Sequence, residues 1–91
     1  MPTMTMVTFD DLDMEQVGQR LRQARDLLGL TQEQVAWRAN YTLANYNALE
    51  KGRRRDMNAT TLYALCHVLG LSSDYLLGLN VASSATPELA G

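Results

Sequence analysis

The chain has 91 residues, a net charge of −2 and 46% hydrophobic residues, which suits one small globular domain. A single cysteine, Cys66, excludes an internal disulfide, and a single histidine, His67, leaves too few ligands for a Cys/His metal cluster. Residues 1–13 lack the pattern of a signal peptide, and no apolar run approaches the ~18 residues of a membrane span, so we expect a cytoplasmic protein without metal or cofactor.

The chain begins with an acidic segment, residues 1–13, that we expect to form a partly disordered arm. A first helix is predicted over 14–28, where Asp13 and Gln16 have the spacing of a capping box. Its apolar residues recur on one face and are expected to be buried: Val17, Leu21, Ala24 and Leu28.

Two short helices follow, at 32–39 and 43–51. Thr31 and Gln34 form a second capping box, and Thr42 is an N-cap for the later helix. The residues expected in the core are Val35, Ala36 and Ala39 from the first of these helices, and Tyr46 and Leu49 from the second.

The last two helices are predicted at 59–69 and 73–77, with N-caps at Asn58 and Ser72. Leu62, Leu65, Cys66 and Leu69 share one face of the former, and Leu76 and Leu77 pack from the latter. No segment alternates with period two, so the fold class is all-α, a five-helix bundle over 14–79. The tail, 80–91, is small and polar, and we expect it to be disordered.

Charge is distributed unevenly along the chain. All eight basic residues lie between positions 20 and 55 with only three acids, a local net charge of +5. The flanks, 1–19 and 56–91, carry −4 and −3. A local basic field attracts a polyanion even when the net charge is negative. The alternative is an ordinary solvated face of a helical domain.

The link 39–42 is too short for its two helices to stack antiparallel, which favours a helix-turn-helix. Around this link the chain resembles the Cro/phage-repressor (XRE-type) helix-turn-helix family. The matching segments are Arg20-Leu21-Arg22, Arg25, Gly29-Leu30-Thr31-Gln32, Val35-Ala36, Thr42, Leu49-Glu50-Lys51-Gly52, Leu69-Gly70-Leu71-Ser72 and Asp74-Tyr75-Leu76-Leu77-Gly78.

The resemblance implies a repressor-like bundle that binds double-stranded DNA as a homodimer, with helix 43–51 in the major groove. It implies a structural ion pair between Arg25 and Glu50; the alternative places Arg25 on a phosphate. It also implies that Gln32, at a helix N-terminus, anchors the DNA backbone. The alternative for Gln32 is a plain solvent-facing residue.

The remaining DNA-binding candidates surround helix 43–51. Asn47 has the amide that reads adenine, and Asn45 is placed to reach a base or the backbone. Arg38 and the Arg53-Arg54-Arg55 run are phosphate candidates, although such a run also suits a helix end as a solubilising segment. The other candidates are Thr42, Leu43, Ala44, Ala48 and Lys51.

Trp37 falls on the outer face of its helix. It is covered by Val7 and Phe9 of the arm, forms a contact surface for a dimer or another partner, or has no role. Together with the apolar Leu43 and Ala44, it motivates an alternative function, a helix-turn-helix fold that binds protein and little DNA. A regulatory protein partner could dock on the acidic arm.

Catalysis is not expected. Cys66 and His67 are adjacent on a helix and so point about 100° apart, which does not make a catalytic dyad. The sequence therefore predicts a DNA-binding transcriptional regulator, a dimeric repressor associated with the nucleoid.

Overall fold

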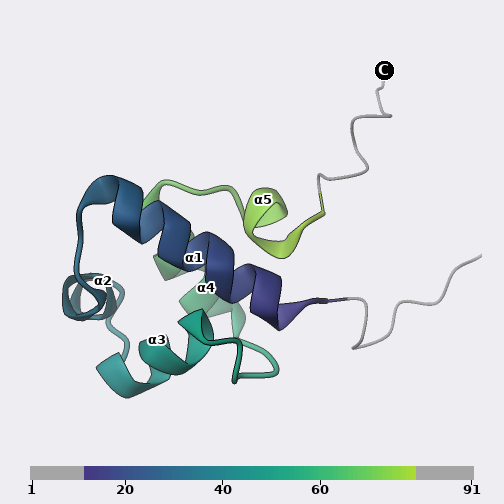
Figure 1. The fold of residues 1–91 in the computed structure, drawn as a ribbon, viewed down its shortest axis with the longest axis horizontal. Helices are drawn as coiled ribbons and strands as arrows, with labels where there is room; N and C mark the ends of the chain where they lie inside the picture. The colour runs from purple at the N-terminus through teal and green to yellow at the C-terminus, as the bar shows by residue number, and fades with distance from the viewer. Residues whose placement is uncertain (1–11, 80–91) are drawn as a thin grey trace, which may run out of the picture.

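The structure, a computed structural model, describes residues 12–79. Five helices follow one another along the chain (Figure 1): α1 (Met14–Leu28), α2 (Gln32–Arg38), α3 (Leu43–Glu50), α4 (Ala59–Leu69) and α5 (Ser73–Leu77). No strand occurs within residues 12–79, so the predicted all-α, five-helix class is confirmed. Only two predicted ends are wrong, each by one residue, since Ala39 and Lys51 are the C-caps of α2 and α3.

The helices begin where side chains replace the missing backbone partners of the first turn. Thr31, Thr42, Asn58 and Ser72 each accept a hydrogen bond from the backbone N–H three residues later. The capping box of Thr31 and Gln34 is complete in both directions. At Asp13 the cap is one-sided, because its carboxylate accepts from the N–H groups of Glu15 and Gln16 but the structure gives no return bond from Gln16.

Residues with a left-handed backbone conformation lie in the turns after the helices. Asn40 adopts a φ of 55°, as the short turn between α2 and α3 requires, and asparagine tolerates this conformation better than most residues. The turn keeps α2 and α3 in contact and leaves α3 on the outside of the bundle, along the lower edge in Figure 1.

The core forms around α1, which contacts α3, α4 and α5, while α2 contacts α3 and α4. Its twelve buried hydrophobic residues are Met14, Val17, Leu21, Ala24, Val35, Ala36, Ala39, Tyr46, Leu49, Leu65, Leu69 and Leu76. Gly18 lies where α1 meets the end of α3, and a methyl group there would collide with the carbonyl oxygens of Leu49 and Glu50.

One predicted core position, Leu28, is wrong, whereas Leu62, Cys66 and Leu77 lie at the edge of the core and pack against it. Leu28 is 53% exposed because the bundle does not extend over the last turn of α1, where open space surrounds the neighbouring Gly29. On α4, Thr61 takes a buried place, while Leu62 and Cys66 are only partly buried. Leu77 is also only partly buried and packs against the core.

Candidate nucleic-acid interface

A buried ion pair joins α1 to the end of α3. The Nε of Arg25 donates to Oε2 of Glu50 at 2.6 Å, and its Nη2 donates to Oε1 at 3.2 Å. The Arg25 side chain is 14% exposed and that of Glu50 is 3% exposed. Nη1 of Arg25 also donates to the backbone carbonyl of Leu30, 2.9 Å away. The predicted contact between Arg25 and Glu50 is therefore confirmed, and it fixes α1 against the base of α3.

The electrostatics of this pair keep both partners charged. Burial alone would raise the pKa of the Glu50 carboxyl, but hydrogen bonds from Arg25 and Gln32 outweigh it, and the pKa lies below its ordinary value of 4.5. The hydrogen bond to Glu50 likewise raises the pKa of Arg25 despite its burial. An ionised Glu50 offers only acceptor atoms to its neighbours.

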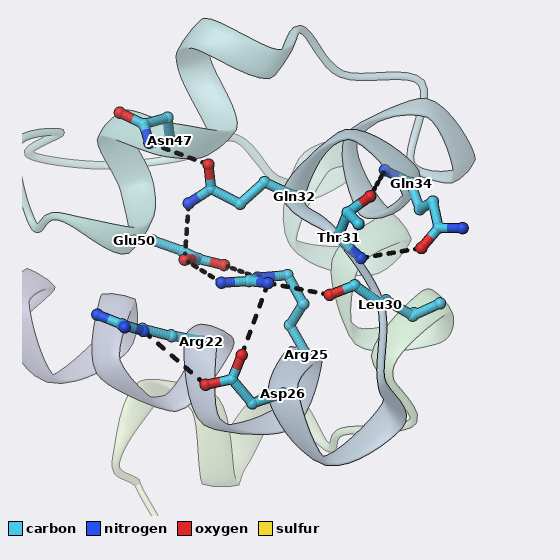
Figure 2. A network of polar contacts seen from close by, with 9 residues as sticks. All are labelled: Arg22, Arg25, Asp26, Leu30, Thr31, Gln32, Gln34, Asn47 and Glu50. Carbon is cyan, nitrogen blue, oxygen red and sulfur yellow. Dashed lines mark hydrogen bonds and ion pairs between the residues drawn. The ribbon is translucent and has the colours of Figure 1, made fainter.

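Gln32 extends the ion pair toward the surface of α3 (Figure 2). Its Nε2 donates to Oε1 of Glu50 at 2.9 Å, and its Oε1 accepts from Nδ2 of Asn47 at 3.0 Å. The sequence did not reveal this link between two predicted DNA-binding residues. The phosphate contact of Gln32 stays a prediction. The second N–H of its Nε2 takes part in neither of these hydrogen bonds and is available to donate to a phosphate.

The outward face of α3 combines apolar and amide groups. Leu43 is 44% exposed, and Ala44 is also exposed, whereas Asn45, Asn47 and Ala48 are partly buried. Thr42 caps α3 by accepting the N–H of Asn45 at 3.1 Å. Leu43 and Ala44 thus lie on the outer surface of α3, and Asn47, in the middle of the helix, is partly exposed.

A basic loop follows α3. Lys51, Arg53 and Arg55 are exposed, and Arg54 is partly buried because its Nη1 donates to Oδ1 of Asn45 at 3.0 Å. This contact ties the loop to α3 and was not predicted. Arg54 therefore lies against α3 at Asn45, and a cation there suits an anionic backbone that runs along the helix.

The other basic residues divide between structural and exposed roles. On α1, Nη1 of Arg20 donates to the carbonyl of Leu76 at 3.3 Å, and its guanidinium lies 5.7 Å from the ring centre of Tyr75. Arg22 pairs with Asp26 at 3.9 Å in the open. Arg38, at the end of α2, is exposed. The local net charge of +5 in the sequence therefore overestimates the number of cations at the surface, because Arg20 and Arg25 make contacts within the fold.

Three further side chains can be placed. Trp37 is 81% exposed and lines a shallow hollow with Glu33, Gln34 and Arg38. Its predicted cover, Val7 and Phe9, lies outside the described residues. Tyr41 packs against the core from the turn, and His67 is an exposed residue whose ring stacks on Tyr63.

Two negative findings apply to residues 12–79. No group of three or more potential metal-ligating His, Cys, Asp or Glu side chains is found there. Within the same stretch, none of the helices combines the length and the apolar character that crossing a bilayer requires.

Comparison with known proteins places these features in a family. A family model described as a helix-turn-helix domain matches residues 18–80. The chain is 36% identical over 67 residues to the HTH-type transcriptional regulator ImmR of Bacillus subtilis. That match covers 74% of this chain and 52% of ImmR, so the chain spans about half the length of this curated relative.

Solved structures agree with the sequence comparison. The restriction-modification controller protein C.AhdI from Aeromonas hydrophila superposes with a TM-score of 0.65 and 28% identity, over 70% of this chain and 96% of that protein. The clp gene regulator ClgR from Corynebacterium glutamicum superposes with a TM-score of 0.68 and 30% identity, over 81% of this chain and 78% of that one.

Proposed function

The chain belongs to the XRE-type helix-turn-helix family of DNA-binding transcriptional regulators, and we propose that it acts as a sequence-specific dimeric repressor. The proposal places α3 in the major groove of duplex DNA and the loop after α3 beside the phosphate backbone. The family is one of regulators and not of enzymes. In this role the protein works in the cytoplasm, on the nucleoid.

One observation carries the proposal: the partly exposed amides of α3 are followed at once along the chain by exposed cations. Asn47 is partly exposed on α3, and Lys51, Arg53 and Arg55 are exposed in the segment that follows. Amides read base edges, and cations neutralise phosphates, so the two parts of a DNA interface adjoin. Leu43 and Ala44 add apolar contacts of the kind made with a thymine methyl group.

A homodimer is the second part of the proposal. A single α3 offers few polar groups to the bases, and two copies about one helical turn apart, ~34 Å, would read both halves of a two-fold site. DNA shape at the positions between the half-sites would add further discrimination.

The salt dependence of binding tests the proposal. The affinity for a generic duplex should fall steeply with salt, and the double variant Arg53→Ala, Arg55→Ala should reduce the slope by about 0.9 for each phosphate that the protein no longer neutralises. Arg22→Ala is the matched control, because it removes an exposed arginine of α1 that already pairs with Asp26. A shallow slope that is the same for all three proteins would contradict the proposal.

A second candidate function is a protein-interaction module. The observation in its favour is the 81% exposure of Trp37, together with the 44% exposure of Leu43, because large apolar side chains at the surface often mark contact sites. A regulatory protein partner would then occupy the hollow beside Trp37. Under this alternative, duplex binding would be weak at low salt, and Trp37→Ala would abolish capture of the partner.

A further inference from the structure

Gln32 and Asn47 both end in an amide, whose carbonyl accepts hydrogen bonds and whose NH₂ donates them. The two ends are similar in size, so what such a side chain recognises depends on which end faces outward. The orientation of the Asn47 amide therefore decides what the middle of α3 can read.

Glu50 determines the orientation of Gln32. An ionised carboxylate only accepts, and Oε1 of Glu50 lies 2.9 Å from the Nε2 of Gln32. Turning the Gln32 amide over would place its carbonyl oxygen against a carboxylate that is 3% exposed and held by Arg25. Two acceptors facing each other in a buried place are strongly unfavourable. The NH₂ end of Gln32 is thus held toward Glu50.

Gln32 in turn determines the orientation of Asn47. With its NH₂ on Glu50, Gln32 directs Oε1 toward α3, where it accepts from Nδ2 of Asn47 at 3.0 Å. A flipped Asn47 would bring two carbonyl oxygens together. In Figure 2 the oxygen of Asn47 accordingly points away from Gln32. One N–H of Nδ2 is left over beside that oxygen.

We propose that Gln32 is a specificity-determining positioning residue, through which the charge of Glu50 holds the Asn47 carbonyl outward before DNA is bound. This relay of Glu50, Gln32 and Asn47 rests on the proposed function and deepens it. An outward carbonyl with an N–H beside it matches adenine, which presents an amino donor and the N7 acceptor in the major groove. Guanine presents two acceptors there, O6 and N7, and would meet the carbonyl unfavourably.

The neighbouring asparagine on α3 is oriented in a different way. Nη1 of Arg54 donates to Oδ1 of Asn45 at 3.0 Å, so Asn45 keeps its NH₂ for other partners. Within residues 12–79, no side-chain hydrogen bond or ion pair links this pair to Glu50 and Gln32. Arg54→Met therefore serves as a control that releases Asn45 and leaves Asn47 held.

Selection of binding sites from a randomised duplex library tests the relay. The parent should prefer adenine at one position per half-site by about tenfold, within the range of a good bidentate contact. Asn47→Ala and Gln32→Met should both lose that preference, and the double variant should resemble Asn47→Ala alone. Arg54→Met should weaken binding to all duplexes and keep the preference. Retention of the adenine preference by Gln32→Met, or a uniform loss over all duplexes, would overturn the relay.

A measurement without DNA separates this inference from the proposed function. In the free protein, NMR relaxation should find the Asn47 side-chain amide as rigid as the backbone of α3, and Gln32→Met should make it mobile. Equal mobility in both proteins would refute the relay. A rigid amide in a parent that selects no duplex would instead refute the proposed function and leave the fixed orientation of Asn47 standing.

Discussion

The part of the molecule where α3 packs against α1 and α2, here called the front, is held together differently from the part where α4 and α5 pack against α1, here called the rear. At the front, a chain of polar contacts runs from Arg25 through Glu50 and Gln32 to Asn47. At the rear, the buried residues are mainly leucines, Leu65, Leu69 and Leu76, and the contact of Arg20 with a Leu76 carbonyl supplements them.

The difference teaches what each kind of contact can specify. Apolar packing is non-directional, so it fixes where a helix lies but not which polar atom a surface residue presents. Hydrogen bonds are directional, and a chain of them that starts at a buried charge fixes donors and acceptors one after another. Under the proposed function, the front is the half that presents such atoms to DNA, whereas the rear supports it.

The largest expected effect comes from breaking the front at Arg25. Arg25→Met keeps an unbranched side chain of similar reach but leaves Glu50 buried without its cation, which should destabilise the fold by about 3–5 kcal/mol. Chemical denaturation measures the loss. The control is Arg22→Met, whose pair with Asp26 is 69% and 60% exposed and should be worth less than about 1 kcal/mol. Equal effects of the two changes would contradict a special role for the buried pair.

The helix boundaries follow largely from local signals in the sequence. The caps at Thr31, Thr42 and Ser72 set the helix starts to the residue, because each uses a short side chain to satisfy its own first turn. Leu28 was misplaced because helical periodicity states which face is apolar and not how far the neighbouring elements extend.

The candidate site was less predictable than the fold. The resemblance supplied the pair of Arg25 and Glu50, but Gln32 and Asn47 are fifteen positions apart and meet only through the angle between α2 and α3. The contact of Arg54 with Asn45 depends in the same way on the path of a loop. Such contacts need the backbone geometry, because many residue pairs at similar spacing never meet.

A smaller loss is expected at Gly18, where α1 lies close against the end of α3. Gly18→Ala should destabilise the protein by about 1–3 kcal/mol, because the new Cβ would lie 2.6 Å from the Glu50 carbonyl oxygen and force the helices apart. Ala is otherwise favoured over Gly inside a helix, so any decrease in stability would by itself indicate the clash with α3. Gln19→Ala, at the exposed neighbouring position, should be nearly neutral. A stabilised Gly18→Ala protein would mean that the front tolerates a wider helix spacing.

The smallest expected effect concerns Tyr46, a fully buried residue on the inner face of α3. Among the described residues, its hydroxyl is the buried side-chain polar atom with no hydrogen-bond partner, although the Glu50 carboxylate affects its pKa. Burial, followed by the influence of the Glu50 carboxylate, raises the pKa of Tyr46 above its ordinary value of 10, so the hydroxyl stays protonated.

Removal of that hydroxyl shows whether the polar chain at the front has a further member. If the hydroxyl is unpaired, Tyr46→Phe removes a desolvated group without breaking a bond, and stability should stay the same or rise by up to about 1 kcal/mol. Thermal unfolding at neutral pH measures the change. A decrease of about 1 kcal/mol or more would mean that the hydroxyl donates to Glu50 in solution. In that case, the Glu50 carboxylate that orients Gln32 would accept hydrogen bonds from Tyr46 of α3 as well as from Arg25 of α1. Tyr46 would then be a further member of the polar chain, at its buried end.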